Sequence, residues 1–362
     1  MIDLKDYGYT EPLSPSNDLV AGRITELRRE QYTVVTAHGE VTAVLKGSFF
    51  HGAAAREEFP CVGDFVLLQY NESGASRIAQ LLPRRSKFSR ADFSGHAAGY
   101  VKTILEQVVA ANFDYVFILS SLNGDFNPSR IDRYLTQARQ SGGQPVVMLT
   151  KADLAEDFRA PLDDVRKLAP DVPVHAVSAH TGLGLDALNE YLQPGKTVVF
   201  LGMSGVGKSS LLNALMRREV MAVTAVREDD SRGRHTTTHR QLFMLPSADG
   251  VRPGAMIIDT PGMRELGLFD ADAGISAGFS DVENLFARCR FSDCLHRAEP
   301  GCAVLAALAD GSLPHERWAR YLVQKRESKF VDDKSGYLKD KQTWHKNLAK
   351  WSKQVKKNGG KK

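Results

Sequence analysis

One glycine-rich segment constrains the fold of this chain more than any other feature of its sequence. Residues 202–209 read Gly-Met-Ser-Gly-Val-Gly-Lys-Ser, between an apolar run over 197–201 and a helical pattern over 210–216. A phosphate-binding loop requires this strand–loop–helix context. The glycines let successive backbone N–H groups face a phosphate, and the dipole of the following helix adds positive potential. The segment therefore predicts an α/β domain that binds a nucleotide.

The residues of this loop have separate expected tasks. Lys208 is expected to neutralise the β- and γ-phosphates and so to act in catalysis, and the Ser209 hydroxyl is expected to coordinate Mg²⁺. The other expected contact residues are Gly202, Met203, Ser204, Gly205, Val206, Gly207 and Ser210. The flanking strand and helix argue against a chance glycine-rich turn. The loop alone does not distinguish ATP from GTP.

Two polar segments that follow apolar runs indicate the base. The first consists of Thr150, Lys151, Ala152 and Asp153, and it resembles the guanine-reading Asn-Lys-x-Asp motif. Its carboxylate would accept hydrogen bonds from N1–H and the 2-amino group of guanine, and adenine lacks this pair of donors. The lysine stem would lie against the ring. The second segment, Ser178-Ala179, resembles the loop whose backbone N–H contacts guanine O6. Together with the phosphate loop, these segments favour GTP and argue against a kinase or an ATPase.

The segment Asp-Thr-Pro-Gly at residues 259–262 completes the nucleotide motifs. Asp259 ends an apolar run, where the carboxylate close to Mg²⁺ is expected, and the Gly262 N–H is expected to sense the γ-phosphate. A Pro-Gly turn has the same sequence, and the two readings do not exclude each other.

The polar segment 232–239 reads Arg-Gly-Arg-His-Thr-Thr-Thr-His and lies between the phosphate loop and Asp259. One of its threonines is expected to complete Mg²⁺ coordination, since such loops become ordered around the γ-phosphate. We favour Thr237, with Thr236 and Thr238 as alternatives. The expected Mg²⁺ ligands are therefore Ser209, Thr237 and Asp259.

The catalytic water requires a residue that orients it. Met263 follows the Asp-Thr-Pro-Gly segment, where many GTPases have glutamine, and a thioether does not position water. We take His235 as the candidate, with His239 as the alternative. The missing glutamine also predicts slow intrinsic turnover that a partner accelerates.

The motifs stand in a permuted order. Ordinary GTPases begin with the phosphate loop, whereas here Lys-x-Asp and Ser-Ala precede it and Asp-x-x-Gly comes last. The sheet survives such a permutation, because domain termini usually lie close together at the surface. As a consequence, the γ-phosphate-sensing segment continues directly into the C-terminal part of the chain, and we expect it to transmit the nucleotide state there.

The N-terminal part predicts a small β-barrel. About five short strands are expected between residues 19 and 83, with a hairpin connection at His38-Gly39. We favour the OB-fold, and a small SH3-like barrel is the alternative. Cys61 is expected to be an ordinary core residue in a barrel strand.

A cluster of metal-binding side chains follows the nucleotide motifs. Cys289, Cys294, His296 and Cys302 lie within 14 residues of sequence. This set matches closed tetrahedral Cys₃His coordination of Zn²⁺, in which no position is open for catalysis. We expect a structural zinc ion that stabilises a small helical module.

Positive charge is concentrated at the C-terminus. Residues 339–362 contain nine lysines and one acid, whereas residues 1–338 carry a net charge of −4. Four apolar residues recur on one face of this tail, namely Trp344, Leu348, Trp351 and Val355. The tail is either a solvated helix that packs on the protein or an RNA-binding helix. A second basic run, Arg84, Arg85, Lys87 and Arg90, leaves the barrel.

The sequence has no apolar stretch of membrane-spanning length, and its acidic first residues, which lack an apolar core, are not expected to act as a signal peptide. Clustered cysteines suit a reducing compartment better than a disulfide framework does. We therefore expect a cytoplasmic protein without a membrane partner. No dimerisation signal is present, so we expect a monomer.

Taken together, these motifs resemble the ribosome small-subunit-dependent GTPase A family, which are circularly permuted GTPases of bacterial ribosome assembly. The resemblance implies late maturation of the small subunit, contact with its rRNA, hydrolysis of GTP to GDP stimulated by the ribosome, and zinc held by the Cys₃His set. Thr150 departs from the general asparagine, which leaves more of the guanine selectivity to Asp153. The expected parts are an extension (1–18), the OB-fold (19–90), the permuted G domain (100–274), the zinc-binding domain (275–335) and the tail (336–362).

Two other functions are consistent with the residues alone. The chain could be a GTPase that acts on another RNA, in tRNA modification or translation. It could also be an RNA-binding module that uses GTP only as a ligand.

Overall fold

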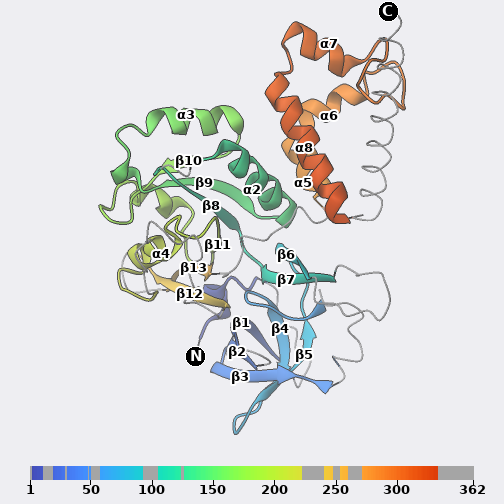
Figure 1. Cartoon of the computed structure of the whole chain (residues 1–362). Helices are drawn as coiled ribbons and strands as arrows, with labels where there is room; N and C mark the ends of the chain where they lie inside the picture. The colour runs from blue at the N-terminus through green and yellow to red at the C-terminus, as the bar shows by residue number, and fades with distance from the viewer. Residues whose placement is uncertain are drawn as a thin grey trace, which may run out of the picture. The chain divides into compact units, whose positions relative to one another are not determined.

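The computed structural model describes residues 2–10, 19–28, 31–47, 49, 58–92, 105–123, 126–221, 240–247, 253–259 and 271–332. The chain divides into two compact units, Met1–Leu266 and Gly267–Lys362. The first unit holds a barrel and a parallel sheet with helices, and the second is helical (Figure 1). No helix in these described ranges has the length and hydropathy needed to cross a bilayer.

Five strands close into the N-terminal barrel. They pair in the order β1-β2-β3-β5-β4, and β4 pairs again with β1. Side chains that alternate along the strands, such as Ile24, Val34 and Ile78, are fully buried inside it. A closed five-stranded barrel confirms the predicted OB-fold. The strands are β1 (Val20–Arg28), β2 (Gln31–Thr36), β3 (Gly39–Leu45), β4 (Phe65–Gln69) and β5 (Ser76–Leu81).

The α/β part is built on five parallel strands and one antiparallel strand, in the order β10-β9-β8-β11-β13-β12. The strands are β8 (Tyr115–Ser121), β9 (Gln144–Thr150), β10 (Val174–Ala176), β11 (Thr197–Leu201), β12 (Arg240–Pro246) and β13 (Pro253–Asp259). The helical segments are α2 (Pro128–Ser141), η3 (Ala152–Leu154), α3 (Arg159–Leu168), η4 (Asp186–Glu190) and α4 (Lys208–Met216).

Helices cover both faces of this sheet. Ile118 and Val147 belong to the core that α2 and α3 cover, whereas Phe117 and Met148 belong to the core that α4 covers. Successive residues of a strand point to opposite faces, so strands buried on both sides are apolar throughout. This explains why uninterrupted apolar runs in the sequence marked the strands.

Two elements at the β10 edge of the sheet are short. β10 itself has three residues. The segment after it is helical only over the 3₁₀ element η4, because Gly184 and Gly195, both with positive φ, turn the chain on either side of it. Cys61 is buried as expected, but it lies before β4 rather than in a strand.

A two-stranded antiparallel ribbon was not predicted from the sequence. β6 (Lys87–Asp92) pairs with β7 (Leu105–Ala111) in an antiparallel sheet of their own. The basic run that leaves the barrel therefore continues into a strand.

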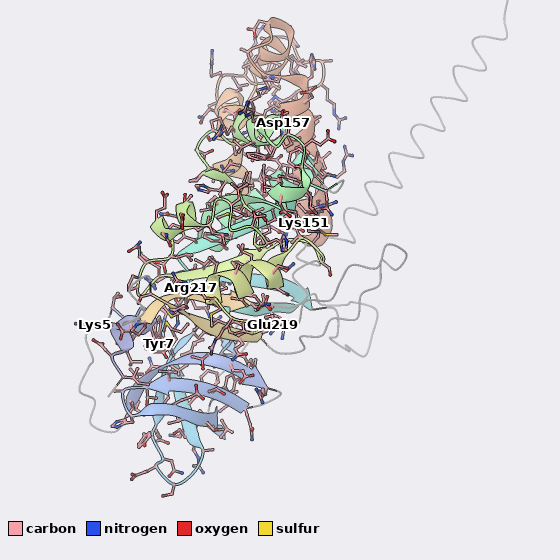
Figure 2. All side chains as sticks on the ribbon, turned by 90° about the vertical axis from the view of Figure 1, so that its left-hand side faces the viewer. Lys5, Tyr7, Lys151, Asp157, Arg217 and Glu219 are labelled. Atoms are coloured by element: carbon pink, nitrogen blue, oxygen red, sulfur yellow. The ribbon has the colours of Figure 1, made fainter. Side chains whose placement is uncertain are left out.

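The barrel and the α/β sheet are continuous. Leu27 of β1 pairs with Arg240 of β12, which joins them into one eleven-stranded sheet. The 3₁₀ segment η1 (Leu4–Tyr7) contacts both β1 and β13. Figure 2 shows its side chains Lys5 and Tyr7 at this junction.

The second unit contains four helices in its described part. Its core includes Ile275, Phe279, Val282 and Val304, all fully buried. The helices are α5 (Asp272–Gly278), α6 (Ser280–Phe286), α7 (Ala303–Asp310) and α8 (His315–Asp332). The cysteine and histidine cluster lies between α6 and α7. The lysine-rich tail falls outside the described residues.

Candidate functional site

The described residues of the predicted nucleotide site follow strand ends at one edge of the parallel sheet. β9 ends at Thr150, β11 leads into Gly202, and β13 ends at Asp259. Ser178 and Ala179 follow shortly after β10. Parallel strands have their carboxyl ends at the same edge, and open α/β sheets bind ligands there.

The phosphate loop has the backbone that its glycines permit. A Cβ on Gly202 would lie 2.7 Å from the carbonyl oxygen of Leu119, so a larger residue would collide with β8. Gly205 and Gly207 have φ values of 76° and 102°, which other residues rarely adopt. Lys208 Nζ donates hydrogen bonds of 2.6 Å to the carbonyl oxygens of the loop's first two residues. The ammonium group is therefore held against the loop itself.

The rest of the phosphate loop leads into the N-terminus of α4. Ser204 and Gly205 are exposed, whereas Val206 is buried. Ser209 and Ser210 lie in the first turn of α4, where free N–H groups and the helix dipole favour an anion.

The two base-reading segments contact each other. The Ala152 N–H donates to the carbonyl oxygen of Val177 at 3.2 Å. Lys151 adopts a left-handed backbone conformation with φ of 58°, and Asp153, two residues later, is exposed. The hydroxyl of buried Ser178 hydrogen-bonds to this carboxylate and lowers the pKa of Asp153. The carboxylate therefore stays ionised, as an acceptor for two N–H groups must.

A further hydrogen bond connects the base-reading segment to the phosphate loop. Thr150 Oγ1 donates to the carbonyl oxygen of Val206 at 2.6 Å. On the other side of the loop, burial raises the pKa of Asp259, and the charge of Lys208 opposes this shift. A partly buried carboxylate near a lysine has the chemistry of a cation ligand, because a divalent ion stabilises its ionised form.

Several predicted residues lie outside the described part of the chain. They are Gly262, Met263, the histidines His235 and His239, and the threonines Thr236, Thr237 and Thr238. Their assignments therefore stay predictions.

The Cys₃His set gathers in space as its spacing predicts. The ligand atoms of Cys289, Cys294, His296 and Cys302 all lie within 4.8 Å of one another. Cys289 Sγ is 4.0 Å from Cys302 Sγ, and His296 Nδ1 is 3.6 and 3.4 Å from these sulfurs. Tetrahedral Zn²⁺ coordination separates two sulfurs by about 3.8 Å and sulfur from nitrogen by about 3.6 Å. The cluster therefore fits a metal ion, with Nδ1 as the histidine donor.

Aromatic rings fix the orientation of the histidine. The His296 ring stacks on Phe286 with a centroid distance of 4.4 Å and meets the edge of Trp318 at 5.9 Å. Burial lowers the pKa of His296, which favours the neutral imidazole that metal binding requires.

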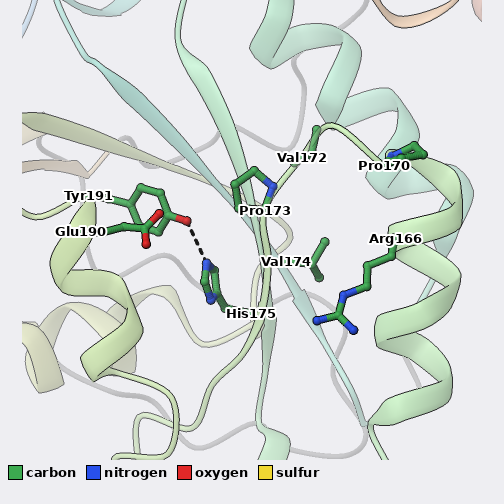
Figure 3. Close-up of a pocket in the computed structure, with 8 residues that line it drawn as sticks. All are labelled: Arg166, Pro170, Val172, Pro173, Val174, His175, Glu190 and Tyr191. Carbon is green, nitrogen blue, oxygen red and sulfur yellow. Dashed lines mark hydrogen bonds between the residues drawn. The ribbon is translucent and has the colours of Figure 1, made fainter.

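A separate hollow of about 550 Å³ lies at the β10 edge of the sheet (Figure 3). In it, His175 Nε2 is 2.9 Å from Tyr191 Oη. The lining residues are Arg166, Pro170, Val172, Pro173, Val174, His175, Glu190 and Tyr191, and none of them belongs to the predicted site. Sequence reasoning missed this hollow, because only folding brings α3 and η4 together.

The sequence is similar to known proteins over most of its length. A protein of Lactiplantibacillus plantarum named "Small ribosomal subunit biogenesis GTPase RsgA 2" is 41% identical over 333 residues, which cover 91% of this chain and 90% of that protein. A protein of Listeria monocytogenes with the same name is 42% identical, over 90% of this chain and 89% of its own.

Solved structures share the fold. The crystal structure of YjeQ from Thermotoga maritima aligns with a TM-score of 0.60 and 26% identity, over 86% of this chain and 98% of that one. The structure of YloQ, described as a circularly permuted GTPase, aligns with a TM-score of 0.56 over 89% of this chain and 99% of its own. At 24% identity, this second alignment supports the fold alone.

These similarities agree with the permuted order of the motifs and with the placement of their described members at one sheet edge. The sequence model of the RsgA GTPase family matches residues 81–269, which include the base-reading segments, the phosphate loop and Asp259. The chain therefore belongs to the RsgA GTPase family, a family of GTP hydrolases.

Proposed function

We propose that this chain binds GTP at the carboxyl edge of its parallel sheet and hydrolyses it to GDP and phosphate in the biogenesis of the small ribosomal subunit. One observation carries the proposal, namely that the guanine-type segment after β9 and the phosphate loop after β11 meet through the Thr150–Val206 hydrogen bond. The names of the relatives support the assignment to the small subunit.

In this site Asp153 reads guanine N1–H and the 2-amino group, and Ser178-Ala179 presents a backbone N–H to O6. Lys208 and the loop N–H groups hold the phosphates, and Gly262 senses the γ-phosphate. His235 orients the attacking water. Ser209, Thr237 and Asp259 are the proposed Mg²⁺ ligands, and the ion supplies charge neutralisation on the phosphates.

The Cys₃His cluster is proposed to hold one structural zinc ion. Three thiolates and one imidazole leave no position open for a reacting water. The core of the second unit is small, so the four ligands stabilise the segment between α6 and α7.

The proposed partner is the small subunit and its rRNA. The basic run that begins at Arg84 and the lysine-rich tail supply positive charge that attracts phosphate backbones, and the OB-fold is a barrel type that binds oligonucleotides. We propose that the protein acts as a monomer in the cytoplasm, where small subunits mature.

GTP turnover with and without purified small subunits tests this function. Small subunits are expected to accelerate turnover, whereas equal amounts of large subunits are expected to leave it near the intrinsic rate. Lys208→Ala is the control for contaminating GTPases and is expected to abolish turnover. Equal stimulation by both subunits would argue against the assignment.

A further inference from the structure

Thr150 stands where the guanine motif usually has asparagine, and its hydroxyl contacts the phosphate loop. It is the last residue of β9 and is 4% exposed. Its Oγ1 lies 2.6 Å from the carbonyl oxygen of Val206 and 3.4 Å from that of Ser120. A hydroxyl has one proton to donate, so the short contact to Val206 is the main hydrogen bond.

This hydrogen bond also restrains the Gly207 N–H, which belongs to the same peptide unit as the Val206 carbonyl. Because the trans peptide unit is planar, its C=O and N–H point in opposite directions. Fixing the Val206 carbonyl toward β9 therefore fixes the Gly207 N–H away from β9. Gly205 and Gly207 flank Val206 with φ values of 76° and 102°, so the intrinsic preferences of these residues restrain the plane weakly. An external anchor supplies the missing restraint.

The base-reading segment, by contrast, is held without this hydroxyl. The backbone oxygen of Thr150 accepts from the Leu122 N–H at 3.0 Å, and the Ala152 N–H donates to Val177. The pKa of the Asp153 carboxyl is lowered by the Ser178 side chain and not by Thr150. The hydroxyl of Thr150 thus contributes to the phosphate side of the site rather than to the base side.

We propose that Thr150 is a positioning residue of the phosphate loop, whose hydroxyl holds the Val206 carbonyl so that the Gly207 N–H is presented to the β-phosphate of the nucleotide. The proposal rests on the nucleotide site of the proposed function. Thr150 therefore couples the strand that carries the guanine motif to the binding of the phosphates.

Nucleotide titrations of three variants test this role. Thr150→Val has nearly the same shape without the hydroxyl, and Thr150→Ser restores the hydroxyl. Thr36→Val is the matched control, because the Thr36 hydroxyl is also buried and donates to a carbonyl, that of Gly39 at 2.9 Å in the barrel hairpin. Thermal melting is recorded for each variant, and Thr150→Ala serves as a second hydroxyl-free variant if the valine protein does not fold.

Thr150→Val is expected to weaken GDP binding about tenfold, the size of one misdirected hydrogen bond to a charged group. Thr150→Ser and Thr36→Val are expected to bind GDP within about twofold of the wild type. GMP has no β-phosphate, so its affinity, measured by competition, is expected to be unchanged by Thr150→Val. The ratio of GDP to IDP affinity, which reports recognition of the 2-amino group, is also expected to stay the same.

The outcomes separate the two proposals. Wild-type protein that does not bind GDP overturns the proposed function. If the wild type binds GDP and Thr150→Val binds it equally well, only the role of Thr150 is overturned. A changed ratio of GDP to IDP affinity in Thr150→Val, or an equal loss for GMP, also overturns it, since both would place the hydroxyl's effect on the base side.

Discussion

Arg23 Nη1 donates a hydrogen bond of 2.9 Å to Thr197 Oγ1, which connects the first barrel strand to the strand that precedes the phosphate loop. The Arg23 side chain is fully buried, and it also donates to the carbonyl oxygens of Tyr7, Gly63 and Asn112 and to Met256 Sδ. Burial lowers the pKa of Arg23 to about 9. One guanidinium group thus satisfies polar atoms from both parts of the first unit.

Replacing Arg23 by methionine is expected to destabilise the first unit by about 3 kcal/mol, because several buried carbonyl groups lose their donor at once. Chemical denaturation, monitored by far-UV circular dichroism, measures the change in the free energy of unfolding. Arg28→Met is the matched control on the same strand, since the Arg28 side chain is 65% exposed, and its effect is expected within about 0.5 kcal/mol. Equal effects of the two substitutions would contradict the role of Arg23.

The sequence predicts those parts of the nucleotide and metal sites that depend on residues close together in the chain. β11 has the predicted bounds because an uninterrupted apolar run ends at the first glycine of the loop, and the Cys₃His ligands gather because they are close in the chain. Arg23 could not be predicted, since its partners lie far away in sequence. The β6–β7 ribbon was missed for a similar reason, because strand pairing depends on a partner beyond a 12-residue connection.

Asp259 is expected to make stability depend on pH. Burial raises its pKa above the ordinary value of 3.8, so the folded state holds this proton more tightly than the unfolded state does. The free energy of unfolding is therefore expected to lose this contribution as pH rises from 3.8 through the folded pKa. Denaturation of nucleotide-free protein from about pH 4 to about pH 7 measures this slope. Asp259→Asn is expected to lack the decrease, and an identical pH profile would contradict the shift.

Metal analysis tests the Cys₃His site. Protein purified without added metal is expected to contain about one zinc ion per chain. Cys294→Ser is expected to lose most of it and to lower the melting temperature of the second unit. Cys61→Ala is the matched control, because this buried cysteine belongs to the first unit, and its zinc content is expected to be unchanged. Full zinc content in Cys294→Ser would contradict the ligand set.

His235 is expected to orient the attacking water. Single-turnover hydrolysis by His235→Ala is expected to fall about 100-fold, the usual contribution of a positioned polar group in such a step. GTP affinity is expected to be retained, because the loop and base contacts remain. His239→Ala is the control, and a larger loss in that variant would transfer the role to His239.

The central claim is that Asp153 and Lys208 hold opposite ends of one guanine nucleotide. Isothermal titration calorimetry of the full chain with GDP and with ADP tests it most directly. GDP is expected to bind at least about 100-fold more tightly than ADP, because a site built to hydrogen-bond donors rejects a base that lacks them. Asp153→Ala is expected to remove most of this preference, whereas Glu156→Ala, three residues further along the chain, is expected to keep it. Equal binding of GDP and ADP, or binding of neither, would contradict the account.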